Sequence, residues 1–136
     1  MQPIIRLGEE VLRKMPLELV EEEHNDTVVV RVKGKRIDAS QAPAFREGVT
    51  KRLEGKPRKI VLDLTLVEFM DSIGLGVLVT CFKRAGGGGH LAIVGAHGAV
   101  AQLLKLTRMD RVFPLFKSVD EAVSSMKSAS SSAQTP

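Results

Sequence analysis

Ser72 is the side chain that is best placed for covalent chemistry in this chain. It follows Asp71 directly, where a predicted buried strand over residues 59–65 leads into an amphipathic helix. Asp and Ser are expected at a helix start, because their side-chain oxygens accept hydrogen bonds from free backbone N–H groups. A serine here lies exposed on a turn, beside N–H groups that no helical carbonyl satisfies. The residues alone leave open whether Ser72 only caps the helix or presents its hydroxyl group to another molecule.

The helix that begins here is expected to continue to about residue 85, with two different faces. Its core face carries apolar residues at positions i, i+3, i+4 and i+7, namely Leu75, Leu78, Val79 and Phe82. The opposite face holds Ile73, Val77, Thr80 and Arg84. Gly74 and Gly76 flank this second face, although each costs the helix about 1 kcal/mol relative to alanine. The small glycines would let a partner's backbone approach closely; the alternative is that Ile73 and Val77 pack under a neighbouring loop.

Other reactive side chains lack a supporting motif. His24 lies in a predicted turn without a second metal ligand at a suitable spacing, and His97 has no Ser-Asp pair near it in the sequence. Cys81 is the only cysteine, which excludes an intramolecular disulfide and favours a small buried hydrophobe. The glycines at 86–89 lack the Lys-Ser/Thr of a phosphate-binding loop. The sequence therefore predicts no enzymatic activity, no metal and no cofactor.

The stretch from Met70 to Leu78 resembles the Asp-Ser-x-Gly-Leu-Gly-Val motif of the STAS domain, and is closest to bacterial anti-sigma factor antagonists. In that family, a partner anti-sigma factor that is also a serine kinase phosphorylates the serine after the Asp. The resemblance implies that Ser72 is the acceptor. Ile73 replaces a frequent Ser or Thr, so Ser72 is the only candidate in the motif. The implied partner-binding residues are Asp38, Asp71, Ile73, Gly74, Gly76, Val77 and Thr80.

A second part of the chain supports the resemblance. Ile37-Asp38, Ala42-Pro43 and Arg46-Glu47 are similar to the family's Ile/Leu-Asp, Ala-Pro and Arg-Glu run. In the family this Asp lies near the phosphorylated serine and helps to form the partner-binding surface; the alternative for Asp38 is a plain helix cap. The chain departs from the family just before it, because Lys35-Arg36 replaces the usual Gly-Glu. This change bears on partner specificity rather than on the fold.

Length and composition limit the function classes. A chain of 136 residues suits one domain with a real core. Neither an apolar run long enough to span a membrane nor a signal peptide pattern is seen, so we expect a cytoplasmic protein that does not bind membranes. The net charge of +4 is modest, the basic residues are scattered, and Trp and Tyr are absent. We therefore expect no binding to nucleic acid.

The order of predicted elements is β-β-α-β-α-β-α-β-α, beginning with a hairpin over residues 17–33. Strands that alternate with helices indicate an α/β fold with a mostly parallel sheet. With the resemblance, we expect a single STAS-like domain over residues 17–126, with a mixed, mostly parallel β-sheet and about four helices. Residues 1–16 would be an N-terminal extension, used either as a loosely held arm or as a homodimer contact. Residues 127–136 are predicted to be a disordered Ser-rich tail.

Two functions remain at this stage. The first, implied by the resemblance, is an anti-sigma factor antagonist that regulates bacterial transcription by partner switching. Its unphosphorylated form would bind an anti-sigma factor kinase, which carries the ATP, and release a sigma factor. Phosphorylation of Ser72 would end this binding, and a serine phosphatase would restore it. The second is a non-switching STAS scaffold in a transporter-associated lipid-trafficking or stress-signalling complex, in which Ser72 is only a cap.

Overall fold

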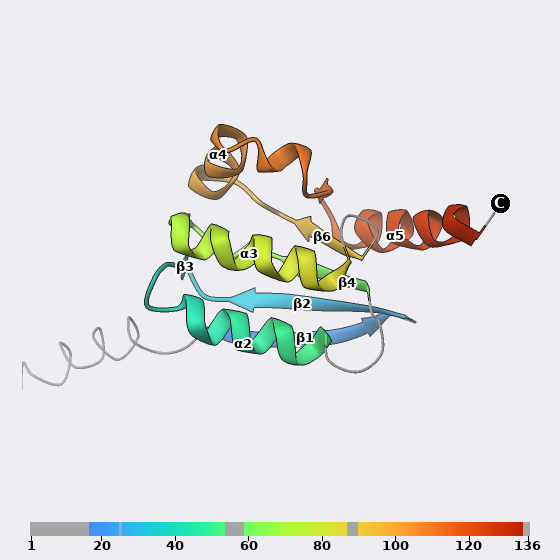
Figure 1. Cartoon of the computed structure of the whole chain (residues 1–136), viewed down its shortest axis with the longest axis horizontal. Coiled ribbons are helices and arrows are strands. Elements are labelled where there is room, and N and C mark those ends of the chain that lie inside the picture. The colour runs from blue at the N-terminus through green and yellow to red at the C-terminus, as the bar shows by residue number, and fades with distance from the viewer. Residues whose placement is uncertain (1–16, 25, 54–58, 87–89, 135–136) are drawn as a thin grey trace, which may run out of the picture.

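A computed structural model describes residues 17–24, 26–53, 59–86 and 90–134. Figure 1 shows a twisted sheet with helices packed on its two faces. The predicted N-terminal extension at 1–16 lies outside the described residues, and its use as an arm or a dimer contact stays a prediction.

In the part of the chain that the structure describes, the main sheet has five strands in the order β1-β2-β4-β6-β7. They are β1 (Glu18–His24), β2 (Thr27–Lys33), β4 (Lys59–Asp63), β6 (Leu91–Val94) and β7 (Leu115–Phe116). β1 pairs antiparallel with β2, and every other neighbouring pair is parallel. All five residues of β4 are buried, as expected for a central strand that is apolar on both faces. The predicted mixed, mostly parallel sheet is confirmed.

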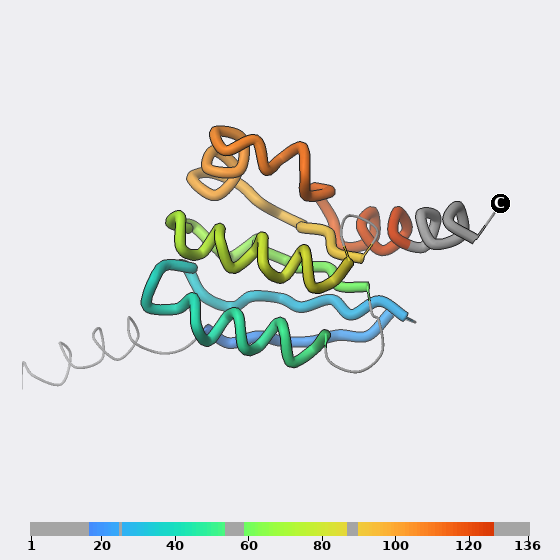
Figure 2. The backbone as a smooth tube through the Cα atoms, in the orientation of Figure 1, coloured from blue at the N-terminus to red at the C-terminus, as the bar shows by residue number. Residues whose placement is uncertain are grey.

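Within the described residues, four α-helices cover the sheet: α2 (Ala42–Leu53), α3 (Ser72–Ala85), α4 (Gly98–Leu106) and α5 (Val119–Gln134). The larger core lies under α2, α3 and α4, where Val28, Val30 and Val32 of β2 point. The smaller core lies under α5 and takes up Val29, because side chains alternate between the faces of a strand. Figures 1 and 2 show α2 and α3 side by side on one face, both starting at the same end of the molecule.

A second, two-stranded sheet joins the segments before α2 and α3. Its strands are β3 (Arg36–Ile37) and β5 (Phe69–Met70), which pair in parallel with Ile37 opposite Met70. The Arg36 guanidinium also lies 4.6 Å from the centre of the Phe69 ring, a cation–π contact. The sequence does not predict these strands, because two-residue pairings have no periodicity of their own. They hold the loop before α2 against the start of α3 (Figure 2).

The C-terminal part of the domain has a short strand and a long helix. A 3-10 turn at Met109–Arg111 precedes β7, which has only two residues. The backbone is helical from Val119 to Gln134, a range that includes part of the predicted disordered tail at 127–136. The helix starts with a capping contact, in which the Ser118 hydroxyl accepts a hydrogen bond from the Glu121 N–H at 3.2 Å. No Gly or Pro then interrupts the chain before residue 136, so extending the helix costs little.

Gly74 and Gly76 serve different purposes in α3. A Cβ atom on Gly74 would lie 2.2 Å from the backbone oxygen of Ile37, whereas one on Gly76 would meet nothing within 4 Å. Gly74 is buried and lets α3 start directly against β3. The missing side chain of Gly74 thus makes room for the protein's own backbone, and the predicted part of both glycines in admitting a partner stays a prediction.

Gly74→Ala should lower the free energy of unfolding by about 1–3 kcal/mol, because a backbone carbonyl cannot move aside as a flexible side chain does. Gly76→Ala is the matched control and should leave stability unchanged or raise it by up to about 1 kcal/mol, the helix-propensity difference. Urea unfolding monitored by circular dichroism measures both. Equal effects of the two substitutions would contradict the close approach of α3 and β3.

Candidate functional site

The start of α3 leaves the Ser72 hydroxyl group without a structural task. Asp71 is the N-cap, with an extended backbone, and its carboxylate accepts a hydrogen bond from the Gly74 N–H at 2.9 Å. Ser72 is the first residue of the helix and is exposed. Among the described residues, its hydroxyl has no hydrogen-bond partner. The idea that Ser72 serves as the helix cap is therefore not supported, because Asp71 has that role.

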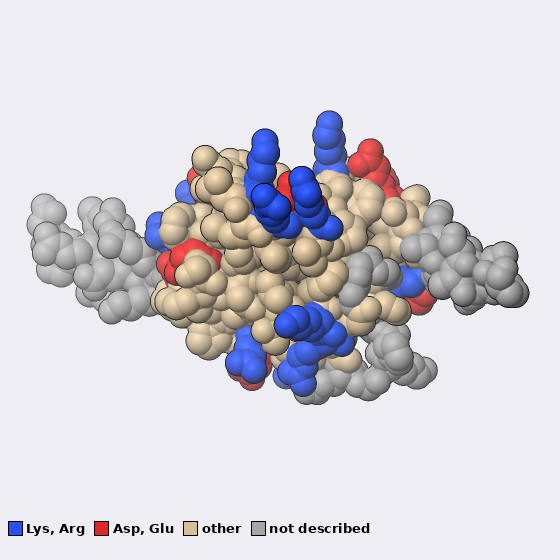
Figure 3. Space-filling model, turned by 45° about the horizontal axis from the view of Figure 1, so that its top comes forward, with Lys and Arg blue, Asp and Glu red and all other residues tan. Residues whose placement is uncertain are grey.

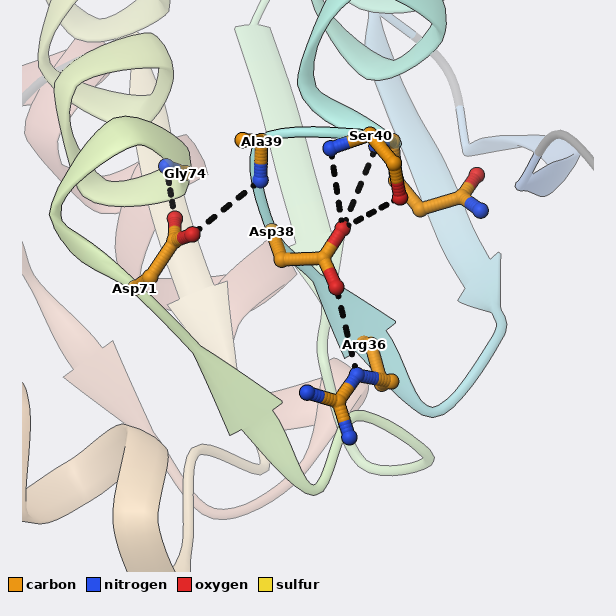
Figure 4. Close-up of polar contacts among 7 residues, drawn as sticks. Arg36, Asp38, Ala39, Ser40, Asp71 and Gly74 are labelled. Carbon is orange, nitrogen blue, oxygen red and sulfur yellow. Dashed lines mark hydrogen bonds and ion pairs between the residues drawn. The ribbon is translucent and has the colours of Figure 1, made fainter. Parts of the chain in front are cut away.

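The same carboxylate also holds the segment before α2. Its second oxygen, Oδ2, accepts a hydrogen bond from the Ala39 N–H at 3.1 Å. Figure 4 shows the Asp71 carboxylate between Gly74 of α3 and Ala39 of the neighbouring loop. One side chain thus caps one helix and anchors the entry to the other. The two predicted site segments, 37–47 and 70–80, meet at this point.

Asp38 organises the turn that leads into α2. Its Oδ1 accepts hydrogen bonds from the Ser40 N–H at 3.0 Å, the Ser40 hydroxyl at 2.6 Å and the Gln41 N–H at 3.3 Å. Its Oδ2 accepts from the Arg36 Nε at 3.2 Å. These donors favour the charged carboxylate, the Ser40 hydroxyl most of all, and they lower the pKa of Asp38 against a smaller opposing effect of burial. Asp38 therefore acts through the shape of this turn, and its predicted contact with a partner stays a prediction.

An apolar groove runs between α2 and α3 beside Ser72. Its volume is about 520 Å³, and its lining residues are Ala39, Ala42, Pro43, Arg46, Glu47, Thr50, Ile73 and Val77. Ile73 is 53% exposed, an unusual exposure for a large apolar side chain. The alternative that Ile73 packs under a neighbouring loop finds no support among the described residues. The groove offers a surface for an apolar segment of another molecule.

The sequence predicts one wall of this groove and misses the other. Ile73 and Val77, from the partner-binding set, form the α3 wall. Thr80 does not line the groove, and its hydroxyl donates to the Gly76 carbonyl at 3.0 Å. The α2 wall was missed, although its signal is visible: Pro43, Glu47 and Thr50 recur at helical spacing on the side opposite Phe45 and Val49. Only the tertiary structure shows that this side faces α3.

The remaining reactive groups are placed as structural residues. Burial raises the pKa of Cys81 to about 11, so the thiol stays protonated at neutral pH. A ring nitrogen of His97 lies 2.8 Å from the backbone oxygen of Thr65. In the part of the chain that the structure describes, no three His, Cys, Asp or Glu residues are grouped as a metal site. No described helix has the length and apolar character needed to cross a bilayer.

Asp38→Asn should destabilise the fold at pH 7, because an amide oxygen replaces a carboxylate that accepts from four donors. The folded-state pKa of Asp38 is lowered, so its charge contributes stability above the unfolded value. That contribution is lost as the pH falls through the folded-state pKa, which lies below 3.8. Wild type and variant should therefore converge in stability below pH 3.8. Urea unfolding at a series of pH values tests this, and a constant difference down to pH 2 would contradict it.

Comparisons with known proteins agree with this architecture. The STAS domain family matches residues 18–122. A Thermotoga maritima protein named as a candidate anti-sigma factor antagonist is 32% identical over 104 residues, which are 75% of this chain and 92% of the relative. The anti-sigma-F factor antagonist RsfB of Mycobacterium tuberculosis is 27% identical over 105 residues, 77% of this chain and 85% of its own.

A solved structure extends the likeness to three dimensions. The crystal structure of an anti-sigma factor antagonist from Mycobacterium paratuberculosis superposes with a TM-score of 0.73 at 29% identity, over 82% of this chain and 94% of that one. The family match spans the sheet and reaches into α5, and these relatives are matched over most of their length. The chain belongs to the STAS domain family and is related to its anti-sigma factor antagonists.

Proposed function

We propose that this protein is an anti-sigma factor antagonist that is switched by phosphorylation of Ser72. Its unphosphorylated form binds an anti-sigma factor with serine kinase activity, and the sigma factor held by that anti-sigma factor is released. The kinase supplies the bound ATP, and a serine phosphatase returns phospho-Ser72 to serine. The observation that carries the proposal is the exposed Ser72 hydroxyl, free of any cap, at the edge of an apolar groove.

The groove explains why the unphosphorylated form would bind. Ile73 offers apolar area that is exposed in the isolated chain, and burying apolar surface yields about 25 cal/mol for each Å². Val77 and the α2 residues continue this surface on both sides. A partner segment that enters the groove therefore passes close to the Ser72 hydroxyl. Binding and phosphorylation then involve one region of the molecule.

The position of Ser72 explains why phosphate would end the binding. A phosphate adds about −1.5 to −2 charges at pH 7, next to the Asp71 carboxylate. The helix N-terminus offsets part of this charge, but the Gly74 N–H already donates to Asp71. A partner in contact with Ile73 would clash with the bulk of the phosphate and would have to desolvate its charge. A loss of about 1.4 kcal/mol already weakens binding tenfold.

The switch is tested with the purified anti-sigma factors of the source bacterium, each examined by calorimetry with ATP present. One of them should bind the unphosphorylated chain and phosphorylate it at Ser72, as located by mass spectrometry. Phosphorylation should weaken binding at least tenfold, with circular dichroism unchanged. Equal affinities of the two forms would exclude the switch and leave a fixed scaffold.

Substitutions at Ser72 should separate charge from capping. Ser72→Ala should keep binding and cost little stability, since Asp71 caps α3, and it should abolish phosphorylation. Ser72→Asp should weaken binding less than phosphate does, because one carboxylate carries less charge. The same calorimetry measures all three forms. A Ser72→Ala chain that is still phosphorylated would place the acceptor elsewhere.

Ile73→Ala should weaken binding of the anti-sigma factor roughly tenfold, because a central apolar contact of an interface is commonly worth more than 1 kcal/mol. Leu106→Ala is the matched control: Leu106 is 75% exposed and does not line the groove. Unfolding curves should stay close to wild type for both. Equal losses of affinity for the two variants would show that the groove is not the binding surface.

A further inference from the structure

Cations lie along the groove between α2 and α3 and beyond its C-terminal end, and the switch does not use them. We infer that the groove takes an acidic partner: a helix with an apolar face whose carboxylates meet these cations. This inference rests on the proposed function, because it specifies the partner surface that the same groove would recognise. The argument depends on the groove's shape, on its unpaired cations and on their distance from Ser72.

The shape of the groove suits a helix. Figure 1 shows α2 and α3 side by side. The groove between them is lined mainly by small or apolar side chains from both helices. The apolar ridge of a third helix packs into such a valley, as helix-in-groove complexes do. Ala39, Ala42 and Pro43 keep the α2 wall low at the end near Ser72. A partner side chain can therefore reach the floor there.

Cations lie along the groove and beyond it. Arg46, in the first half of α2, lines the groove, and Arg84 lies near the C-terminal end of α3, on the same face as Ile73 and Val77. Lys51 and Lys83 belong to the last turns of α2 and α3. Figure 3 shows a group of Lys and Arg side chains over this part of the surface, below a broad uncharged area. Within the described residues, none of these four cations has an ion-pair partner.

Several other cations of the described residues form ion pairs within the protein, which distinguishes them from these four. Arg52, which belongs to α2 like Arg46, contacts Glu21 at 3.0 Å. Arg36 contacts Asp38 at 3.2 Å, and the Lys35 ammonium group lies 3.9 Å from the Glu68 carboxylate. The helix dipole accounts for basic residues in the last turns of α2 and α3, where they are stabilising. It does not account for Arg46, which lies in the middle of α2. Glu47 is the one acid among the groove-lining residues.

The cations in the last turn of α3 are far enough from Ser72 to act separately. Ser72 and Arg84 are twelve residues apart in one helix, about 18 Å at a rise of 1.5 Å per residue. The Debye length at physiological salt is about 8 Å. A phosphate on Ser72 is therefore screened from Lys83 and Arg84 and is not neutralised by them. The cations attract an acidic partner in both states, and the phosphate alone decides between the states.

The test uses synthetic helical peptides as probes, so it does not require the natural partner. One peptide carries apolar residues at i, i+3, i+4 and i+7 with Glu at the flanking positions, and a second replaces each Glu by Lys. Fluorescence anisotropy at low salt measures affinity, and NMR amide shifts locate the site. We expect the acidic peptide to bind at least tenfold more tightly, with the largest shifts at Thr50, Ile73 and Val77. Equal affinities, no binding of the acidic peptide, or shifts centred outside the groove would overturn the inference.

Charge reversal provides the matched comparison. Arg46→Glu with Arg84→Glu should remove the preference for the acidic peptide, whereas Lys105→Glu with Arg111→Glu makes the same change of charge away from the groove and should leave it intact. Arg46→Gln with Arg84→Gln is the milder pair if the first destabilises the fold. Equal effects of the groove pair and the control pair would assign the preference to net charge alone and overturn the inference.

The outcome is independent of the switch experiment. If an anti-sigma factor binds in a phosphorylation-dependent manner but ignores the reversed charges, the proposed function stands and this inference fails. If the peptides behave as expected but no anti-sigma factor binds, the acidic specificity stands and the proposed function fails. With a natural partner in hand, Arg84→Glu alone should lower the affinity of both phosphorylation states by the same factor. A change in the ratio between the states would contradict the separation of the two ends.

Discussion

The double hydrogen bond of the Asp71 carboxylate is the interaction on which this site depends. One oxygen caps α3 through Gly74, and the other fixes the entry to α2 through Ala39. An N-cap of this kind is worth about 0.5–2 kcal/mol, and here the same group also sets the position of a second helix. Because Asp71 meets the needs of the helix start, the adjacent Ser72 hydroxyl is left unused by the fold. A residue that the fold does not need can change its charge without unfolding the domain.

The surroundings of Asp71 are built to be rigid. Asp38 closes the turn before α2 with three hydrogen bonds from Ser40 and Gln41, and the pairing of Ile37 with Met70 ties that turn to the strand before α3. Gly74 completes the arrangement by letting the helix touch the Ile37 carbonyl. Rigid placement lowers the entropy cost of binding, since the groove walls are ordered before a partner arrives. The exposed Ile73 side chain is therefore held in place on an ordered surface.

The sequence predicts the parts of this fold that repeat along the chain. Alternating apolar residues locate β1 and β2, and helical spacing locates α2 and α3 with their buried faces. The resemblance of residues 70–78 to a family motif singles out Ser72 as the expected phosphate acceptor, a role that periodicity cannot identify. What could not be predicted is set by contacts between distant segments: the pairing of β3 with β5, the Ile37 carbonyl above Gly74, and the α2 wall of the groove. The helical backbone of residues 127–134 falls where a Ser-rich composition predicts disorder, in a segment that contains no helix breaker.

On the proposed function, the groove divides two tasks that a single surface often combines. We propose that affinity for a class of partner comes from Ile73, Val77 and the cations, none of which phosphorylation alters. On the same proposal, control comes from a charge on Ser72, next to the Asp71 carboxylate and distant from Arg84. Lys35 and Arg36 should contribute little to the attraction of a partner, because Glu68 and Asp38 already pair with them. The loss of the family's usual acid before Ile37 should therefore change the surface charge available to a partner less than the residue types suggest. On our inference, the unpaired cations of α2 and α3 determine that the partner is acidic.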